Sequence, residues 1–309
     1  MRLDDVGFSE NVRDQRGQSF GGGGFGGGGG IMGLLFGLVL SRFGIGGVLL
    51  LGLGYCAMTM MGGSGTGGSG AVAPHQQSAA RSGAADGGAG GSAAAQACGK
   101  DAVSAFSCRV LRSTELTWTQ LFQAQGQTYQ PAQFTFYGGT GRSGCGVAQS
   151  AMGPFYCPSD QSIYLDTSFF ELLQTRFRAA GDFAQAYVIA HEVGHHIQQL
   201  TGVLDRASGE QRRLSAAQGN AVQVRVELQA DCYAGVWAGR NRERMEPGDL
   251  EEGMRAAEAI GDDTLQRGAQ GRVAPESFTH GTSAQRMAWL RRGIESADPA
   301  SCDTFSGAV

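Results

Sequence analysis

The chain has 309 residues, of which 52 are glycine, and its formal net charge is −4. A mildly acidic chain without a stripe of basic residues is a poor match to a nucleic-acid-binding protein, so we expect no nucleic-acid partner. The glycines gather in two low-complexity runs that cannot bury enough apolar surface to fold. The C-terminal residues after these runs are enough for one compact domain.

The N-terminal part reads as a tail followed by a membrane anchor. The first glycine-rich run ends a tail over residues 1–30, and the apolar segment 31–61 follows it. Within this segment, residues 43–61 carry no charge and are long enough to cross a bilayer as one helix. Small residues at 71–73 raise the alternative of a cleaved signal peptide, but they lie far beyond the apolar run. We therefore expect a single transmembrane helix.

The basic residues near this span predict its orientation. Four arginines precede the span, whereas the first basic residue after it is Arg81. The positive-inside rule then places the tail in the cytoplasm and the C-terminal domain on the outer side, which for the inner membrane of a bacterium is the periplasm. A domain that faces the cytoplasm is the alternative.

The second low-complexity run, residues 62–97, predicts a flexible linker of Gly, Ala and Ser. The folded domain is then expected over residues 98–309. Of the seven cysteines, Cys56 lies in the predicted span, and the other six form the even set that an oxidising compartment favours. Cys145 and Cys157 bracket a short turn-rich stretch and are the expected disulfide pair, while the pairing of the other four stays open.

Residue patterns within this domain predict an α+β fold, with a small antiparallel sheet followed by helices. Aromatic and β-branched residues bounded by turn residues predict strands at 134–137 and 162–166. Apolar residues at helical spacing predict helices at 117–123, 168–178, 182–200, 220–240, 249–261 and 282–296.

Three of the five histidines of the chain lie between residues 191 and 196. On a helix, His191 and His195 lie one turn apart on the same face, so both imidazoles can bind one metal ion. Glu192 lies beside them at the edge of that face. The pattern His-Glu-x-x-His is typical of two zinc ligands with a glutamate as general base. A surface helix with two exposed histidines is the alternative, but the apolar neighbours favour a buried helix whose polar residues need partners.

Catalytic zinc usually has three protein ligands and keeps one position for water. Glu227 and Asp231 are also one helical turn apart, and apolar residues flank them. We expect Glu227 to bind the metal and Asp231 to accept the second ring N–H of a ligand histidine, which fixes the ring. The sequence therefore predicts a Zn²⁺ site formed by His191, His195 and Glu227.

Several longer stretches carry a resemblance to a known family, namely GPFYCPSDQSIYLD, GDFAQAYVIAHEVGHHIQ, VELQADCYAGVWA, AIGDDTLQ, SFTHGTSAQRMAWL and the closing CDTF. Over residues 98–305 and the N-terminal anchor, the sequence resembles the bacterial membrane-anchored neutral zinc metallopeptidases. The resemblance implies a zincin-like metalloprotease domain that cleaves peptide bonds in a peptide or protein substrate. By analogy with zincins, the strand at 162–166 is expected to be the edge along which a substrate pairs.

Peptide hydrolysis also needs a group that stabilises the oxyanion of the tetrahedral intermediate. We expect His280 in this catalytic role, with Arg286 and Tyr233 as alternatives, and Glu192 as the catalytic base. His196 is expected to support the site or to lie at the surface. The competing function is a zinc-stabilised, membrane-tethered binding or assembly module without turnover.

Overall fold

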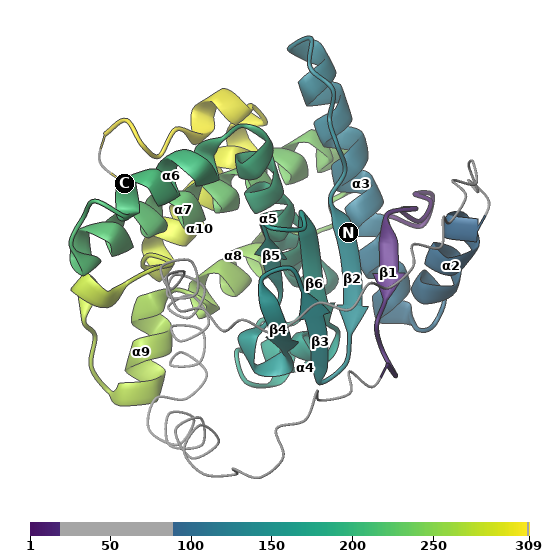
Figure 1. The fold of residues 1–309 in the computed structure, drawn as a ribbon, viewed down its shortest axis with the longest axis horizontal. Helices are drawn as coiled ribbons and strands as arrows, with labels where there is room; N and C mark the ends of the chain where they lie inside the picture. Colours follow the sequence, from purple (N-terminus) through teal and green to yellow (C-terminus); the bar gives the residue numbers. More distant parts are fainter. Residues whose placement is uncertain (19–88, 308) are drawn as a thin grey trace, which may run out of the picture.

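The computed structural model describes residues 1–18, 89–307 and 309. Helices and two small sheets form a mixed domain that is mostly helical, so the predicted α+β class is confirmed. Figure 1 shows the main sheet on one side of the molecule and most helices on the other. The helices are α2 (Ala89–Cys98), α3 (Ala102–Ala124), α4 (Ser168–Thr175), α5 (Asp182–Leu200), α6 (Val203–Gln211), α7 (Ala216–Arg240), α8 (Asp249–Ala259), α9 (Asp262–Gln270) and α10 (Ser283–Ser296).

The main sheet has four strands, in the order β1 (Val12–Asp14), β2 (Gln133–Tyr137), β6 (Ser162–Asp166) and β5 (Phe155–Cys157). A separate antiparallel hairpin consists of β3 (Thr140–Ser143) and β4 (Gly146–Gln149). In the main sheet, β1, β2 and β6 are parallel, and only β5 is antiparallel to its neighbour. The predicted antiparallel sheet is therefore wrong in its strand directions. The two predicted strands pair in parallel as β2 and β6, because the residues between them form the hairpin and β5 and bring the chain back in the same direction.

The strand at 162–166 is present as β6, but it is not the edge of the sheet. It lies between β2 and β5, and its backbone pairs with both of them. The edge that lies against α5 is β5. The expectation that residues 162–166 form a substrate-binding edge is therefore wrong.

The N-terminal residues belong to the folded domain. Val12 pairs opposite Phe134, and Leu3 and Val6 are buried in the main core. The side chains of Ser9 and Asn11 also donate hydrogen bonds, of 2.6 and 2.8 Å, to a carboxylate oxygen of the buried residue Glu115 in α3. The expected separate tail over residues 1–30 is wrong for its first part, because residues 1–18 contact the domain and complete its sheet.

The predicted membrane topology is wrong as well. A cytoplasmic tail and a periplasmic domain lie on opposite sides of a bilayer, whereas β1 and β2 are hydrogen-bonded neighbours in one sheet. Among the residues that the structure describes, no helix is both long and apolar enough to cross a membrane. The predicted span at 43–61 lies outside the described residues, as do most of the two glycine-rich runs.

The end of the expected linker is also folded. Residues 89–98 form α2, which packs against β1, and the guanidinium of Arg16 donates a hydrogen bond of 3.1 Å to the carbonyl of Ala97. A disulfide joins Cys98 at the end of α2 to Cys108 in α3. The domain therefore begins before residue 98.

The other disulfides tie loops and chain ends to the core. Cys145 is bonded to Cys157, as predicted, and this bond links the hairpin region to β5. The pairing that the sequence left open is Cys98 with Cys108 and Cys232 with Cys302. The last of these connects α7 to the short 3-10 helix η4 (Pro299–Cys302).

Helix α5 follows the predicted range of 182–200 residue for residue. By contrast, α3 is much longer than the predicted 117–123. The prediction missed the N-terminal half of α3 because that half buries hydroxyl side chains and shows no clear apolar stripe. Thr114, for example, donates to the carbonyl of Leu111 at 2.6 Å, so the helix itself satisfies a buried hydroxyl. Neither α6 nor α9 was predicted, because their residues show no clear apolar periodicity.

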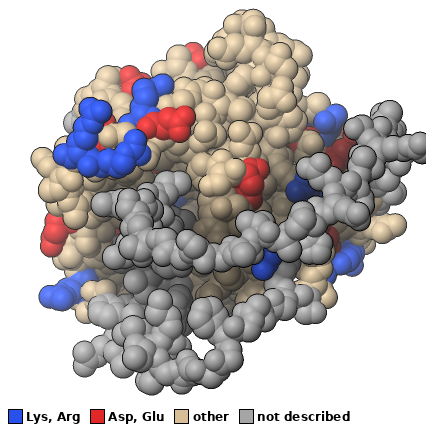
Figure 2. All heavy atoms as spheres, viewed as in Figure 1, with Lys and Arg blue, Asp and Glu red and all other residues tan. Residues whose placement is uncertain are grey.

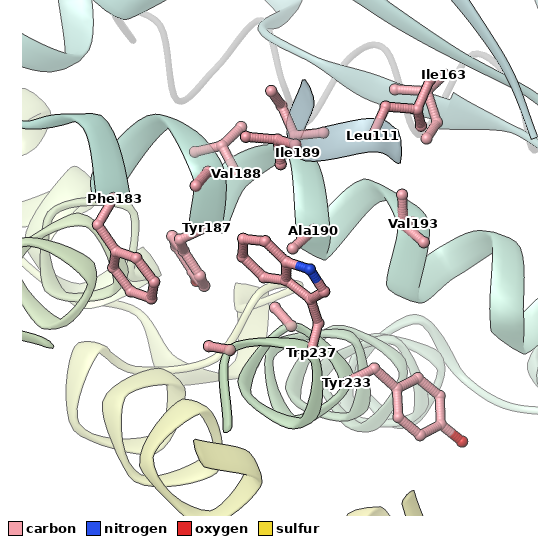
Figure 3. Packing of buried hydrophobic residues seen from close by; sticks show 14 of the residues in the cluster. Leu111, Ile163, Phe183, Tyr187, Val188, Ile189, Ala190, Val193, Tyr233 and Trp237 are labelled. Carbon is pink, nitrogen blue, oxygen red and sulfur yellow. The ribbon is translucent and has the colours of Figure 1, made fainter. Parts of the chain in front are cut away.

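Helix α5 is buried on two sides. Figure 3 shows Leu111 and Ile163, from α3 and β6, on one side of α5, and Trp237 and Tyr233 of α7 on the other. The indole N–H of Trp237 donates a hydrogen bond of 3.0 Å to the hydroxyl of Ser113. Because both faces of α5 are packed, the side chains along it have fixed positions.

The charged surface is mixed in sign. On the face drawn in Figure 2, one group of Lys and Arg residues lies over the part where Figure 1 draws α6, next to acidic residues. The exposed arginines of this region include Arg206, Arg212 and Arg213. Positive charge on this face is therefore interrupted by negative charge.

Glycines let the functional helices approach one another closely. A Cβ atom at Gly194 of α5 would lie 2.9 Å from the carbonyl oxygen of Ala230 in α7. A Cβ atom at Gly235 of α7 would overlap the carbonyl oxygen of Leu290 in α10, and one at Gly293 would overlap that of Cys232. Backbone contact at these positions brings the side chains of α5, α7 and α10 within hydrogen-bonding distance.

We expect Gly293→Ala to lower the free energy of unfolding by about 1–3 kcal/mol or more, because the added methyl group forces α10 away from α7. Gly209→Ala is the matched control, since its methyl group would meet nothing closer than the Arg212 guanidinium at 3.7 Å. That control gains helix propensity, so its stability rises by up to about 1 kcal/mol. Chemical denaturation measures both, and equal stability of Gly293→Ala and the unchanged protein would contradict the close helix contact.

Candidate metal centre

Helix α5 presents His191 and His195 on one face. Their ring centroids are 4.8 Å apart, and the rings are nearly perpendicular. His191 is buried and His195 is nearly so, because α7 covers this face of α5. The predicted one-turn spacing is therefore realised with both imidazoles facing the same partner helix.

Glu227 of α7 faces both imidazoles. Its Oε2 atom lies 3.2 Å from His191 Nε2 and 3.6 Å from His195 Nε2. The amide of Gln223, one turn earlier in α7, donates a hydrogen bond of 2.9 Å to the other carboxylate oxygen, Oε1. One ligand atom from each of His191, His195 and Glu227 lies within 4.8 Å of the other two. The structure thus brings together the three residues that the sequence predicted as metal ligands.

The second ring nitrogen of His191 faces Asp231, as the sequence predicted. His191 Nδ1 donates to Asp231 Oδ1 at 2.8 Å. Asp231 is fully buried and also accepts from the Tyr187 hydroxyl at 2.6 Å and from Arg286 Nε and Nη2, both at 2.8 Å. A carboxylate with this many donors is held in one orientation, and it holds the His191 ring in turn.

The charges of the site are strongly coupled. Burial alone raises the pKa of Asp231, but the guanidinium of Arg286 and the ring of His191 outweigh it and lower that pKa to about 2. Burial also raises the pKa of Glu227, yet the charge of His195 and the hydrogen bond to His191 lower it well below its usual range. Both carboxyl groups are therefore anionic at neutral pH.

The pKa values of the two imidazoles are raised, whereas those of the two carboxyl groups are lowered. Burial lowers the pKa of His195, but the charge of Glu227 and the hydrogen bond to it raise that pKa to about 9. Burial likewise lowers the pKa of His191, whereas the charge of Asp231 and the hydrogen bond to it raise it. The site therefore favours a cation between its imidazole nitrogens and Glu227.

The donor set fits zinc. With Nδ1 donating to Asp231, Nε2 is the His191 atom that faces the Glu227 carboxylate, and these two atoms need a proton or a metal cation between them. Two imidazole nitrogens and a carboxylate oxygen are common zinc ligands, whereas calcium and magnesium prefer oxygen ligands. The Glu227 oxygen lies 3.2 and 3.6 Å from the two Nε2 atoms, and two bonds of about 2.0–2.2 Å to one ion can span each of these distances.

Glu192 lies next to His191 and His195, the predicted ligands, and its side chain is buried. Within the described part of the chain, its carboxylate makes no hydrogen bond to another residue. Burial raises the pKa of Glu192, and the charges of His191 and His195 lower it by less. The predicted base is thus a buried carboxyl group that forms no ion pair with another described residue.

His280 lies in the loop before α10, and Asp262 orients it. Its Nδ1 atom is 3.2 Å from Asp262 Oδ1, and Asp262 Oδ2 accepts the backbone N–H groups of Thr279 and His280 at 2.7 and 2.6 Å. Burial lowers the pKa of His280, but the hydrogen bond to Asp262 and the charge of Glu227 raise it. His280 is therefore close enough to the ligand set to interact with its charge, although it is not a member of that set.

The alternatives for the oxyanion-stabilising group have other partners. The guanidinium of Arg286 binds Asp231, and the ring of Tyr233 packs edge-on against Trp118, with centroids 5.4 Å apart. His196 is fully buried, so the expectation of a surface position is wrong. Its ring nitrogens contact the Tyr156 hydroxyl and the carbonyl of Gln130, at 3.1 and 2.7 Å, and tie α5 to β5.

Comparison with known proteins identifies the family. A family profile described as "Putative neutral zinc metallopeptidase" matches residues 1–305. The chain belongs to this family. Its cofactor is Zn²⁺, and the match from residue 1 agrees with the position of β1 inside the domain.

The relatives include proteins of two bacterial species. The chain is 43% identical over 307 residues to "Uncharacterized protein YpfJ" of Escherichia coli (strain K12), covering 97% of each chain. It is 42% identical over 226 residues to "Uncharacterized protein Rv2575" of Mycobacterium tuberculosis, which covers 68% of this chain and 74% of the relative. No solved structure matches the chain at a significant level.

The sequence did not reveal several residues that support the site. Tyr187, Gln198, Asp262 and Gln223 each contact a predicted site residue. Tyr187 and Gln223 lie one helical turn before His191 and Glu227, so their spacing offered a signal. Asp262 offered none, because its contact with His280 depends on the fold.

Zinc binding is expected to depend on pH. Zinc must displace the proton that His195 holds below pH of about 9, so the apparent affinity falls about tenfold per pH unit below that value. An ordinary histidine would cause this fall only below pH of about 6.5. Competition with a chromophoric chelator between pH 7 and 9 measures the slope, and an affinity that is constant over this range would contradict the coupling of His195 to Glu227.

Proposed function

We propose that this protein is a zinc metalloendopeptidase in which His191, His195 and Glu227 hold the metal and Glu192 is the general base. When bound, zinc lowers the pKa of a water molecule and polarises the scissile carbonyl group. The observation that supports the proposal most strongly is the position of Glu192, a buried carboxylate beside the ligand set. It makes no hydrogen bond to another described residue.

Glu192 takes the proton of the attacking water and delivers it to the leaving amine. A base works best when its pKa is close to the working pH, and burial moves the pKa of Glu192 upward in that direction. The charges of the nearby imidazoles limit this rise in the pKa of Glu192. In this proposal one side chain both accepts the proton of the water and donates it to the leaving amine.

His280 stabilises the oxyanion in this proposal. Because its Nδ1 faces Asp262, its Nε2 is the nitrogen that remains to interact with substrate. The raised pKa of His280, which results from Asp262 and Glu227 despite burial, favours the protonated imidazole that an oxyanion needs. Asp262 acts through His280 and is a positioning residue.

The substrate binds as an extended peptide along β5. This strand ends the main sheet and packs against α5, so a chain added to it would run beside the ligand-bearing helix. Pairing of backbones at a sheet edge is a common way to bind peptides of varied sequence. This arrangement suits an endopeptidase, since neither end of the substrate is required.

The competing function is a zinc-stabilised binding module without turnover. A structural zinc site normally completes its shell with a fourth protein ligand. Within the described residues, the ligand set contains no fourth member, and Cys232, the nearest cysteine in sequence, is bonded to Cys302. These features favour a site that keeps a position for water.

We expect Glu192→Gln to retain the fold and the zinc affinity but to lower peptide hydrolysis by about 10²–10⁴-fold, because the base is lost. Casein hydrolysis by the full-length protein with zinc measures this. Glu258→Gln, at an exposed position in α8, is the matched control and should leave the rate unchanged. Equal activity of Glu192→Gln and the unchanged protein would refute the assignment of the base, and absence of activity in both would favour the binding module.

His280→Ala should lower kcat by about 10²–10³-fold, since one oxyanion donor is removed. Its zinc affinity should stay within a few-fold, because His280 is not a ligand in the proposal. Asp262→Asn keeps an acceptor for the backbone N–H groups and should lower kcat by less. If His280→Ala instead abolished zinc binding with kcat unchanged in the loaded enzyme, the proposed catalytic role would be wrong.

A further inference from the structure

A chain of hydrogen bonds lies behind His195, on the side away from Glu227. His195 Nδ1 is 2.9 Å from the side-chain oxygen of Gln198, which lies three residues further along α5. The Gln198 side chain is fully buried between α5 and α7. His195 is thus held by a neutral amide, whereas His191 is held by the carboxylate of Asp231.

The amide of Gln198 can adopt only one orientation. Its nitrogen is 2.7 Å from the backbone carbonyl oxygen of Val226 and 3.1 Å from the side-chain oxygen of Gln229. A backbone carbonyl can only accept a hydrogen bond, so the nitrogen must face Val226 and the oxygen must face His195. His195 Nδ1 therefore carries a proton, and Nε2 is the nitrogen that faces Glu227 and is left for a metal ion.

The chain of contacts continues to the C-terminal segment. The amide nitrogen of Gln229 donates a hydrogen bond of 2.9 Å to the carbonyl of Cys302. Cys302 is fixed on α7 by its disulfide to Cys232, and the hydroxyl of Thr304 donates to the carbonyl of Arg225 at 2.7 Å. The closing CDTF stretch, which the catalytic proposal does not use, thus forms the last support of this chain.

We propose that Gln198 is a positioning residue for His195, and that Gln229 and the Cys302 carbonyl fix its orientation. This inference rests on the proposed metal ligands. Every hydrogen bond in the chain runs in one direction, from His195 to Gln198, then to Gln229, then to Cys302. Removal of one amide leaves buried polar groups unpaired and frees the His195 ring to rotate or to change its tautomer.

A neutral amide suits this position because the site already holds three carboxyl groups. Glu192, Glu227 and Asp231 are all buried around the two imidazoles. Asp231 is balanced by Arg286, but no lysine or arginine hydrogen-bonds to Gln198 in the described part of the chain. Gln198 therefore orients His195 without adding a further buried charge.

The test measures zinc affinity and the visible spectrum of the Co²⁺-substituted full-length protein. Gln198→Met keeps the size of the side chain and removes both hydrogen-bonding groups. We expect its zinc affinity to fall about 10–100-fold, with a changed Co²⁺ spectrum and a native circular dichroism spectrum. Ser113→Ala is the control for general destabilisation, because it removes a buried hydrogen bond between Ser113 of α3 and Trp237 of α7. It should change neither the zinc affinity nor the Co²⁺ spectrum.

Gln229→Met is the second variant, and it carries the test if Gln198→Met does not fold. It leaves Gln198 with Val226 as its remaining acceptor, so a smaller fall in zinc affinity is expected, roughly threefold to tenfold. A folded Gln198→Met or Gln229→Met with unchanged affinity and unchanged Co²⁺ spectrum would overturn the positioning role.

His195→Ala separates this inference from the proposed ligand set. If His195→Ala binds zinc as tightly as the unchanged protein, His195 is not a ligand. The proposed ligand set and the positioning role of Gln198 are then both refuted. If His195→Ala loses zinc while Gln198→Met keeps it, only the positioning role of Gln198 is refuted.

Discussion

The carboxylate of Glu227 between two imidazole nitrogens is the interaction on which the rest of the structure depends. It needs α5 and α7 to run in backbone contact, which Gly194 permits opposite Ala230. A side chain at residue 194 would push the helices apart and move the carboxylate away from the histidines. The sheet, α3 and α10 then serve to hold these two helices at that distance, since α5 packs on α3 and β5, and α7 packs on α10.

The site balances its buried charges in two different ways. On the His191 side, Asp231 is neutralised by the guanidinium of Arg286, which enters from α10. On the His195 side, the uncharged amides of Gln198 and Gln229 form a chain of hydrogen bonds that ends at the backbone carbonyl of Cys302. Both arrangements leave the Nε2 atoms directed at Glu227 and demand a cation there. A buried carboxylate such as Glu192 can then stay outside the ligand set and act on water.

The two one-turn pairs of the site and their meeting were predictable from sequence, whereas most of the other long-range contacts were not. His191 with His195 and Glu227 with Asp231 are one-turn pairs, so helix geometry alone indicated that each pair shares a face. The membership of β1 in the sheet was missed, because pairing between residues 12 and 134 leaves no local pattern and the glycine-rich run beside it suggested a free tail. The contacts of Arg286 with Asp231 and of Gln198 with Val226 were missed for the same reason, as each joins two different helices.

A crystal structure of the zinc-loaded full-length protein, with anomalous data at the zinc absorption edge, tests the central claim most directly. We expect one strong anomalous peak within bonding distance of His191 Nε2, His195 Nε2 and a Glu227 carboxylate oxygen, with a remaining position open to solvent beside Glu192. A peak elsewhere, a fourth protein ligand at that position, or zinc-loaded protein without a peak at these residues would contradict it.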